Sequence, residues 1–183
     1  PALSRYDKTG ALTVVISPLV ALMADQISGL ERHGITSCVA INGLLSMPER
    51  SDALDRVRLG DVGILLVSPE QLRSRALRKV LAQREIGAWV LDEVHCLSKW
   101  GHDFRPDYRY VGRFIREKKG EGAVPPILAL TATANPDVMR DIMSHFRDKV
   151  GVDLMIIDGG ATRINLDFNI VNTTLGAKFA HIH

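Results

Sequence analysis

Cysteine is scarce in this sequence, and so are the long apolar runs that mark a membrane protein. Cys38 and Cys96 are the two cysteines among 183 residues, and they form no C-x-x-C pair, so neither a disulfide framework nor a structural zinc site is expected. The apolar runs are strand-sized and fall short of the roughly 20 residues that a membrane helix needs. We therefore expect a cytoplasmic protein with free thiols, no zinc and no contact with membranes.

An excess of one charge is missing as well. Lys and Arg number 23 against 21 Asp and Glu, which gives a formal net charge of +2, far from the strongly basic balance that by itself indicates nucleic-acid binding. Hydrophobic residues make up 46% and charged residues 24%, as in an ordinary globular protein. Aromatic residues make up only 5%, so a local cluster of them needs an explanation.

What the chain does have is an alternation of short Val-, Ile- and Leu-rich runs with longer amphipathic stretches, which is typical of repeated β-α units around a parallel sheet. We predict strands over residues 12–17, 37–41, 63–68, 88–92, 127–131 and 154–157. A helix is expected after Pro18, where apolar residues recur at helical spacing until Gly34. A second is expected from about Pro136 to Phe146, with Asn135 as its N-cap. The predicted fold class is α/β.

Polar or turn-forming residues follow four of the predicted strands. They are the segments "SPL" from Ser17, "SPE" from Ser68, "DEVH" from Asp92 and "TAT" from Thr131. Ligands bind beyond the carboxyl ends of the strands in a parallel α/β sheet. These four segments are therefore the first candidates for a functional site.

Asp92 and Glu93 would lie at the mouth of the sheet, because they follow an apolar strand. A carboxylate there can hold Mg²⁺, usually through water, while its neighbour deprotonates the water that attacks a nucleotide's terminal phosphate. His95 could link that site to a neighbouring loop. Acidic residues also end strands simply because they are well solvated, and the acidic pair taken alone favours this second interpretation.

Trp100 and Phe104 are large rings in a loop of otherwise polar residues, Gly and Pro. Exposed rings flanked by cations suit stacking on single-stranded nucleic acid, where each stacked base contributes on the order of 1–3 kcal/mol. The rings could equally fold back and anchor the loop, and the residues leave both alternatives open. A basic stretch over residues 73–79 could touch phosphate, although such runs are more often solvated helix faces.

Taken together, these segments resemble the first motor lobe of the RecQ family of superfamily 2 DNA helicases. "SPLVALMADQ" (17–26) resembles motif Ia and "VSPEQL" (67–72) resembles motif Ib. "DEVHCLSKWGHDFRPDY" (92–108) resembles motif II running into the family's aromatic-rich loop. "LALTATA" (128–134) resembles motif III, and "TRINLDFNIV" (162–171) resembles the crossing into the second lobe. The resemblance implies a RecA-like fold of the P-loop NTPase type.

The resemblance also implies roles for individual residues. In the ATP site, Asp92 would help to hold Mg²⁺, Glu93 would be the catalytic base, and His95 would relay to motif III at Thr131 and Thr133. Residues of the aromatic-rich loop would sense single-stranded DNA and couple it to hydrolysis: Trp100, His102, Phe104 and Arg105. Further residues lie in motifs that line the DNA path: Ser17, Gln26, Ser68 and Glu70.

The largest departure from the family pattern is an absence. A P-loop reads G-x-x-x-x-G-K-[ST] and holds phosphates with its amides and lysine, yet no glycine here is followed directly by lysine. The P-loop strand and helix, and the second lobe, are therefore expected outside this chain. Residues 1–165 would form a partial first lobe, and residues 166–183 the start of the crossing or a tail.

The resemblance thus implies an ATP-dependent helicase that uses ATP and Mg²⁺ and moves 3′ to 5′ on DNA in repair or recombination. In a bacterium it would associate with the nucleoid. This chain alone is expected to be inactive. An alternative from a different class is a non-catalytic module, derived from such a lobe, that binds single-stranded DNA or a protein partner. A third is a related motor acting on RNA or in DNA defence, although the aromatic loop argues against ordinary RNA helicases.

Overall fold

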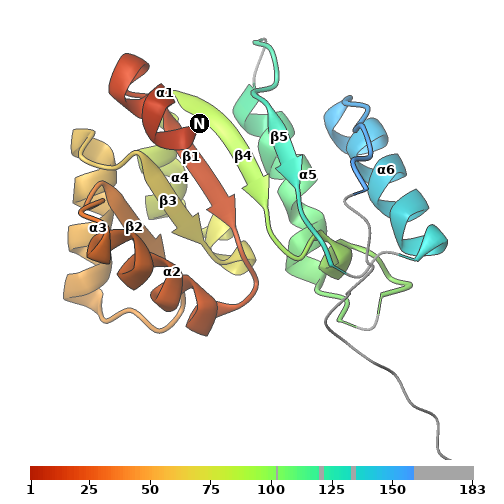
Figure 1. Ribbon diagram of the computed structural model, residues 1–183, viewed down its shortest axis with the longest axis horizontal. Helices are drawn as coiled ribbons and strands as arrows, with labels where there is room; N and C mark the ends of the chain where they lie inside the picture. Colours follow the sequence, from red (N-terminus) through yellow and green to blue (C-terminus); the bar gives the residue numbers. More distant parts are fainter. Residues whose placement is uncertain (102, 120–121, 133–134, 159–183) are drawn as a thin grey trace, which may run out of the picture.

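The computed structural model describes residues 1–101, 103–119, 122–132 and 135–158. Five parallel strands form one sheet in the order β2-β3-β1-β4-β5 (Figure 1). Their bounds are β1 Leu12–Ile16, β2 Cys38–Ile41, β3 Ile64–Val67, β4 Ile86–Leu91 and β5 Ile127–Ala129. The predicted α/β class is confirmed, and the first five predicted strands lie within a few residues of their expected bounds.

Six α-helices are present in the described part of the chain, together with two short 3-10 helices. The α-helices are α1 Ala2–Thr9, α2 Val20–Arg32, α3 Met47–Leu59, α4 Arg75–Ala82, α5 Pro106–Lys119 and α6 Pro136–Val150. The 3-10 helices are η1 Pro69–Arg73 and η2 Val94–Leu97. Asn135 caps α6 as predicted, because its side-chain oxygen accepts a hydrogen bond from the backbone N–H of Val138 at 2.9 Å. Within these residues no helix combines the length and apolar character of a membrane span.

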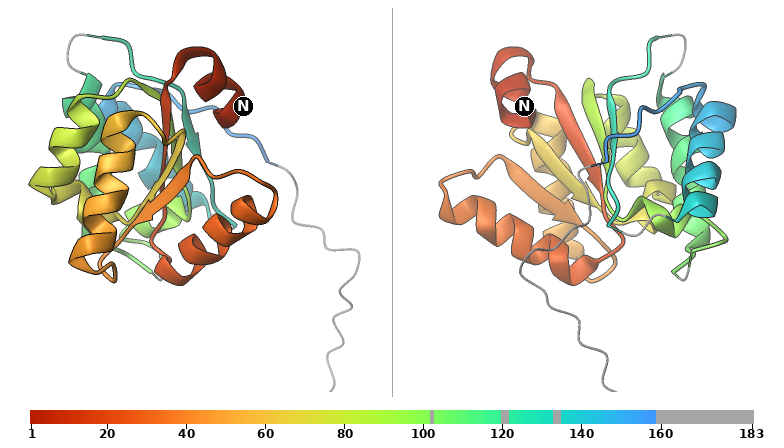
Figure 2. Two further views of the ribbon diagram at one scale, coloured as in Figure 1. Left: turned by 90° about the vertical axis from the view of Figure 1, so that its left-hand side faces the viewer. Right: turned by 45° about the vertical axis from the view of Figure 1, so that its right-hand side comes forward.

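The direction of each crossover decides which face of the sheet a helix covers. Parallel strands are joined by right-handed crossovers, and the step from β1 to β2 runs opposite to the three steps that follow it. Helix α2 therefore lies on one face, while α3, α4 and α5 cover the other (Figures 1 and 2). Helix α1 lies beside the amino ends of β1 and β4, and α6 packs against α5.

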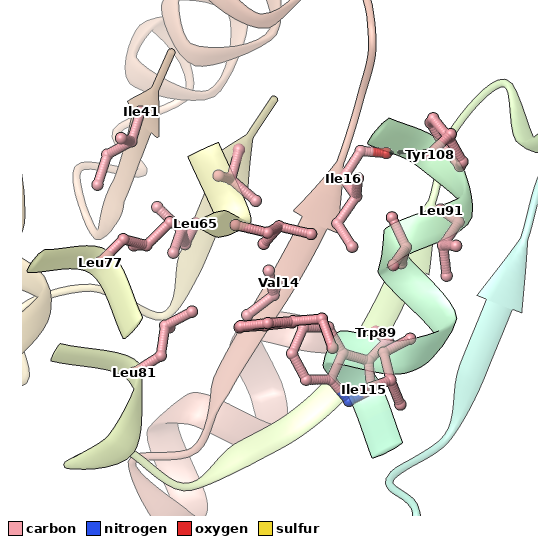
Figure 3. Packing of buried hydrophobic residues seen from close by; sticks show 14 of the residues in the cluster. Val14, Ile16, Ile41, Leu65, Leu77, Leu81, Trp89, Leu91, Tyr108 and Ile115 are labelled. Atoms are coloured by element: carbon pink, nitrogen blue, oxygen red, sulfur yellow. Dashed lines mark hydrogen bonds between the residues drawn. The ribbon is translucent and has the colours of Figure 1, made fainter. Parts of the chain in front are cut away.

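The core lies between the sheet and the α3–α5 layer. Along β4, Trp89 and Leu91 are buried and alternate with the half-buried Ala88 and Val90, as expected when one face of a strand is better covered than the other. The Trp89 ring meets Phe114 of α5 edge to face, with ring centroids 5.9 Å apart. Figure 3 shows Trp89 among the aliphatic side chains that fill this layer. The core thereby fixes α5 against β4.

The predicted strand over residues 154–157 is wrong. The chain after α6 is irregular up to residue 158, and the side chains of Met155 and Ile157 are largely exposed. Strand β5 ends the sheet, and in the described residues no backbone hydrogen bond joins 154–157 to it. A strand needs a neighbour for its N–H and C=O groups, so an apolar run without a pairing partner does not become one.

Candidate active site at the carboxyl edge of the sheet

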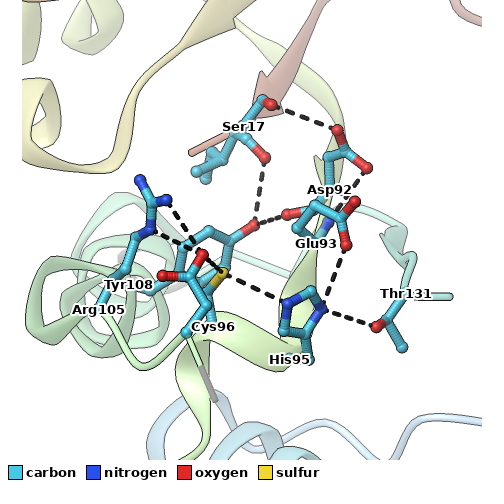
Figure 4. A network of polar contacts seen from close by, with 10 residues as sticks. Ser17, Asp92, Glu93, His95, Cys96, Arg105, Tyr108 and Thr131 are labelled. Carbon is cyan, nitrogen blue, oxygen red and sulfur yellow. Dashed lines mark hydrogen bonds and ion pairs between the residues drawn. The ribbon is translucent and has the colours of Figure 1, made fainter. Parts of the chain in front are cut away.

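The strand-end segments predicted from the sequence lie at the same edge of the sheet. Parallel pairing of β1 with β3 and β4, and of β4 with β5, aligns the carboxyl ends of these strands. Ser17 is buried just after β1, and its hydroxyl donates to the Asp92 carboxylate at 3.2 Å (Figure 4). The ends of β1 and β4 are therefore joined by a side-chain hydrogen bond as well as by the backbone hydrogen bonds of the sheet.

Glu93 has a strained backbone. Its φ of 50° and ψ of 45° lie in the left-handed region, and no other non-glycine residue in the described ranges has a positive φ. Such strain is uncommon and concentrates at functional sites. It turns the chain sharply from β4 into η2 and brings the Glu93 carboxylate to 3.2 Å from Nδ1 of His95.

His95 connects this acidic turn to the end of β5. The side chain is buried, and Nδ1 lies 3.0 Å from the hydroxyl oxygen of Thr131 as well as near Glu93. Figure 4 shows both groups facing this one ring nitrogen. The structure therefore places Glu93, His95 and Thr131 in one contact chain, although Thr131 is distant in sequence. Two other predicted site residues, Thr133 and His102, lie outside the described residues.

A second set of contacts leads from His95 toward the aromatic-rich loop. Sγ of Cys96 lies 3.8 Å from Nε2 of His95, and the thiol donates to the Asp103 carboxylate at 3.5 Å. Arg105 pairs with Asp103 at 3.0 Å and donates to the backbone carbonyl of Pro18 at 2.8 Å. The loop is thus held both to the acidic turn and to the segment that follows β1.

Burial and neighbouring charges shift the pKa values of Cys96 and Asp103 in this connection. Burial, reinforced by the Asp103 carboxylate, raises the pKa of the Cys96 thiol to about 12, so the thiol remains a hydrogen-bond donor at neutral pH. The hydrogen bond from Arg105 lowers the pKa of Asp103. Ligand atoms of His95, Cys96 and Asp103 lie within 4.8 Å of one another, but a structural zinc site needs four ligands with thiolate sulfur. Their contacts are those of a hydrogen-bond network.

The two loop rings are not equivalent. Trp100 is 74% exposed, whereas Phe104 is half-buried. The backbone N–H of Trp100 donates to the Ser98 hydroxyl at 3.2 Å, so the base of the loop is ordered while the indole projects outward. Trp100 is therefore available for stacking, and Phe104 partly anchors the loop.

Tyr108 is a site residue that sequence reasoning missed. Its ring is fully buried in α5, and its hydroxyl contacts the backbone carbonyls of Ile16, at 3.2 Å, and Asp92. Burial raises the pKa of this phenol well above its ordinary value, so it stays a donor. A buried tyrosine needs a hydrogen-bond partner, but the sequence does not show that the partners would be two strand ends.

A family model for DEAD/DEAH box helicases matches residues 1–142. The chain belongs to this family. Among curated relatives, a probable DNA helicase RecS of Bacillus subtilis is 40% identical over 133 residues, or 73% of this chain. The DNA helicase RecQ of the same organism is 37% identical over 159 residues, or 87% of this chain. These matches confirm the resemblance to RecQ-type helicases.

The chain spans only 26% of the length of each of these two relatives. Among solved structures, the DEAD-box helicase Mss116 bound to single-stranded RNA and UDP-BeF superposes with a TM-score of 0.62 at 18% sequence identity. That superposition covers 80% of this chain and 30% of the other. It confirms the RecA-like fold expected for a helicase of this family.

The other predicted residues of this helicase-family chain differ in their surroundings. Ser68 is buried after β3, and its hydroxyl donates to the carboxylate of Glu70, which is exposed. Gln26 lies on the exposed side of α2. The structure therefore places Ser68 and Glu70 side by side and Gln26 apart from them, on a separate element.

The residues present fit one half of a nucleotide site. The half-buried Asp92 carboxylate accepts hydrogen bonds from Ser17 and from the backbone N–H of Glu93, and each oxygen keeps a further lone pair. Carboxylate and water oxygens are the ligands that Mg²⁺ prefers. The other half of the site is a phosphate cradle, and this sequence contains no P-loop pattern.

Proposed function

We propose that this chain belongs to an ATP-dependent, 3′ to 5′ DNA helicase of RecQ type that acts in DNA repair or recombination. It would form the part of the first motor lobe that carries the catalytic carboxylates Asp92 and Glu93. One observation carries the proposal: a continuous set of contacts runs from Glu93 through His95, Cys96 and Asp103 to Arg105. It joins the proposed catalytic base to the loop proposed to bind DNA. Turnover and unwinding are assigned to the longer polypeptide, because the relatives are about three times as long.

In the proposed mechanism each side chain at the carboxyl edge has one task. Asp92 would hold Mg²⁺ through water, and the bound ion would supply positive charge beside the phosphates. The Glu93 carboxylate orients the attacking water and accepts its proton. His95 holds that carboxylate in position and, through its contact with Thr131, connects it to the segment that follows β5.

We assign residues 1–165 to the partial lobe and residues 166–183 to the crossing or a tail.

We assign the coupling of DNA binding to ATP hydrolysis to the contacts that connect the aromatic-rich loop with the Glu93 carboxylate. Single-stranded DNA stacks on Trp100, which is the exposed ring of the loop. The path is further lined by the loop residues His102, Phe104 and Arg105 and by the motifs that contain Ser17, Gln26, Ser68 and Glu70. The backbone N–H of Arg105 donates to the Cys96 carbonyl at 2.8 Å, so a shift of the loop reaches η2 directly. The same shift moves Asp103 relative to Cys96 and thereby His95.

The test is ATP turnover with and without single-stranded DNA, measured on this chain and on a version extended in both directions from its gene. We expect turnover in the extended form alone, stimulated by DNA. Glu93→Gln in the extended form should lower turnover by at least about 10²-fold while DNA binding persists. Trp100→Ala should lower the ratio of DNA-stimulated to basal turnover, since it removes the stacking platform. Turnover by the short chain would contradict our assignment of the nucleotide site.

The second candidate is a non-catalytic module that binds single-stranded DNA or a protein. Two observations favour it: the exposed indole of Trp100 and the absence of a P-loop pattern from the sequence. An extended form that binds single-stranded DNA without ATP turnover would establish this module instead. The same assay with RNA in place of DNA distinguishes a motor that acts on RNA from one that acts on DNA. A cytoplasmic setting, with nucleoid association in a bacterium, belongs to the helicase proposal.

A further inference from the structure

A groove of about 850 Å³ runs along α5 and α6, away from the carboxylates of the candidate site. Figures 1 and 2 show these two helices side by side on one flank of the sheet. The groove is strongly cationic, although the whole chain has a formal charge of only +2. Its charged lining consists of Arg73, Arg109, Arg113, Arg116, Lys149 and the carboxylate Glu117.

The cations in the groove are only partly neutralised. Arg73 pairs with Asp107 at 2.9 Å, and Arg113 pairs with Glu117 at 2.7 Å. Three cations have no ion-pair partner in the part of the chain that the structure describes: Arg109, Arg116 and Lys149. Like charges three and four residues apart weaken a helix, and the pair of Arg113 with Glu117 offsets only part of this cost in the stripe at positions 109, 113 and 116 of α5.

His145 adds a buried polar group to the same groove. It is 4% exposed and lines the groove from α6, and neither ring nitrogen has a hydrogen-bond partner in the described ranges. Burial, together with the positive charges of Arg109 and Lys149, lowers its pKa to about 4, while Asp141 and Asp148 act in the opposite direction. The neutral ring lacks the compensation that buried polar groups normally have.

The amino end of α5, where the groove begins, adjoins two segments of the proposed DNA path. Pro106 lines the groove and directly follows Arg105 of the aromatic-rich loop. Arg73 also lines it and ends η1, the element that begins just after Ser68. The α5 stripe spans about 10 Å at 1.5 Å per residue, so its cations can meet successive backbone phosphates rather than one isolated anion.

We propose that the groove between α5 and α6 binds the phosphodiester backbone of DNA, as a track that leads away from the aromatic-rich loop. Arginine suits this task, because its planar group binds phosphate through paired hydrogen bonds and keeps its charge. Such contacts position a strand without reading its sequence. The inference rests on the proposed function for its ligand, since the loop and η1 supply the DNA that enters the groove.

The test is equilibrium binding of a fluorescent single-stranded oligonucleotide to this chain over a series of salt concentrations. The groove variant combines Arg109→Gln, Arg116→Gln and Lys149→Gln. A matched control combines Lys8→Gln, Arg32→Gln and Arg58→Gln, which remove the same charge from helices α1, α2 and α3. Circular dichroism and thermal melts check that both variants fold. A duplex of equal length and a polyglutamate peptide complete the set of ligands.

Three lost phosphate contacts have a defined signature. Each contact to single-stranded DNA contributes about 0.7 to the slope of log K against log salt, so the groove variant should lose about 2 from that slope and bind on the order of tenfold more weakly at low salt. The control should keep nearly the wild-type slope, and the loss should not depend on base sequence. Equal slopes for groove variant and control overturn the proposal.

The remaining outcomes separate this inference from the proposed function. If Trp100→Ala abolishes DNA binding and the groove variant does not weaken it, DNA stops at the loop, and the groove proposal alone falls. If the wild-type chain binds neither single-stranded DNA nor duplex, the proposed function falls with it. If the groove variant loses polyglutamate but retains DNA, the ligand is an acidic protein segment, which also overturns the proposal.

His145 supplies an independent readout. Titration followed by NMR of its ring protons should give a higher pKa in the presence of oligonucleotide, because a nearby phosphate offsets Arg109 and Lys149. The groove variant should show no such rise on adding DNA. An unchanged pKa in the wild-type chain under saturating DNA would contradict a phosphate beside this ring.

Discussion

His95 and His145 are both buried, at 7% and 4% exposed, yet their surroundings are opposite. Around His95, at the carboxyl edge of the sheet, the ring contacts Glu93, Thr131 and Cys96. Around His145, between α5 and α6, neither ring nitrogen has a partner in the described residues, and the cations Arg109 and Lys149 line the same groove.

The difference shows two ways in which a protein can prepare for a ligand. At the carboxyl edge, polar groups satisfy one another and so hold a defined geometry before any ligand arrives. Between α5 and α6, positive charge is gathered with only partial compensation, so the attraction for an anion is strong. The first arrangement suits chemistry, and the second suits binding of a charged polymer.

The largest expected effect is at Tyr108, which ties the carboxyl edge together. Tyr108→Ala removes a buried ring together with the hydroxyl that contacts the carbonyls of Ile16 and Asp92, so it should lower the free energy of unfolding by about 3–5 kcal/mol. Tyr110→Ala is the control from the groove, where the ring is only half-buried, and should cost on the order of 1 kcal/mol. Urea denaturation gives both values, and equal losses would remove the contrast between the regions.

The next effect tests how closely α5 and α6 approach. A Cβ at Gly112 would collide with the His145 ring, so Gly112→Ala should destabilise by about 1–3 kcal/mol. Gly29→Ala on α2 is the control, since the nearest atom to its new Cβ lies 4.0 Å away; there alanine should stabilise by up to about 1 kcal/mol. Adding His145→Ala to the first variant should recover part of its loss. If the double variant recovers no stability, the loss does not come from the collision between the new Cβ and the His145 ring.

The unpartnered histidine should make stability depend on pH. Its pKa is lowered from 6.5 to about 4, so between those values the unfolded chain binds more protons than the folded one, and stability falls as the pH drops. Allowing for partial screening by solvent, the wild-type chain should lose about 2 kcal/mol relative to His145→Leu between pH 7 and pH 4. Parallel curves of unfolding free energy against pH for the two proteins would refute this.

The smallest effect on stability is expected at Glu117. Its ion pairs with Arg78 and Arg113 lie at the surface, so Glu117→Gln should cost less than about 1 kcal/mol. The same change makes the groove more positive and should strengthen DNA binding several-fold. Asp55→Asn is the control, because it removes one negative charge from a surface pair with Arg58 outside the groove. Equal gains in DNA affinity for both would mean that only overall charge matters.

Local patterns predicted much of the framework. The strands β1 to β5 are continuous apolar runs, and the start of α6 is defined by an Asn that caps the first turn, both of which depend on neighbours in the sequence. The basic stretch over residues 73–79 shows the limit of such reasoning. Its Arg and Lys residues are exposed, as expected of a solvated helix face, but Arg73 also lines the groove and Arg78 pairs with Glu117 on α5. Nothing local indicates which distant helix supplies the partner.

The sequence by itself determined the alternation of strands and helices along the chain, the acidic turn after β4 and the loop that carries Trp100. These features follow from spacing and residue type within short windows. Only the tertiary structure decided that His95 meets Thr131, that Tyr108 reaches the end of β1, and that residues 154–157 remain unpaired. Those outcomes depend on which strands pair and which helices pack, and that is settled by contacts between residues far apart in the chain. The groove between α5 and α6 arises in the same way, since its charges come from three separate elements.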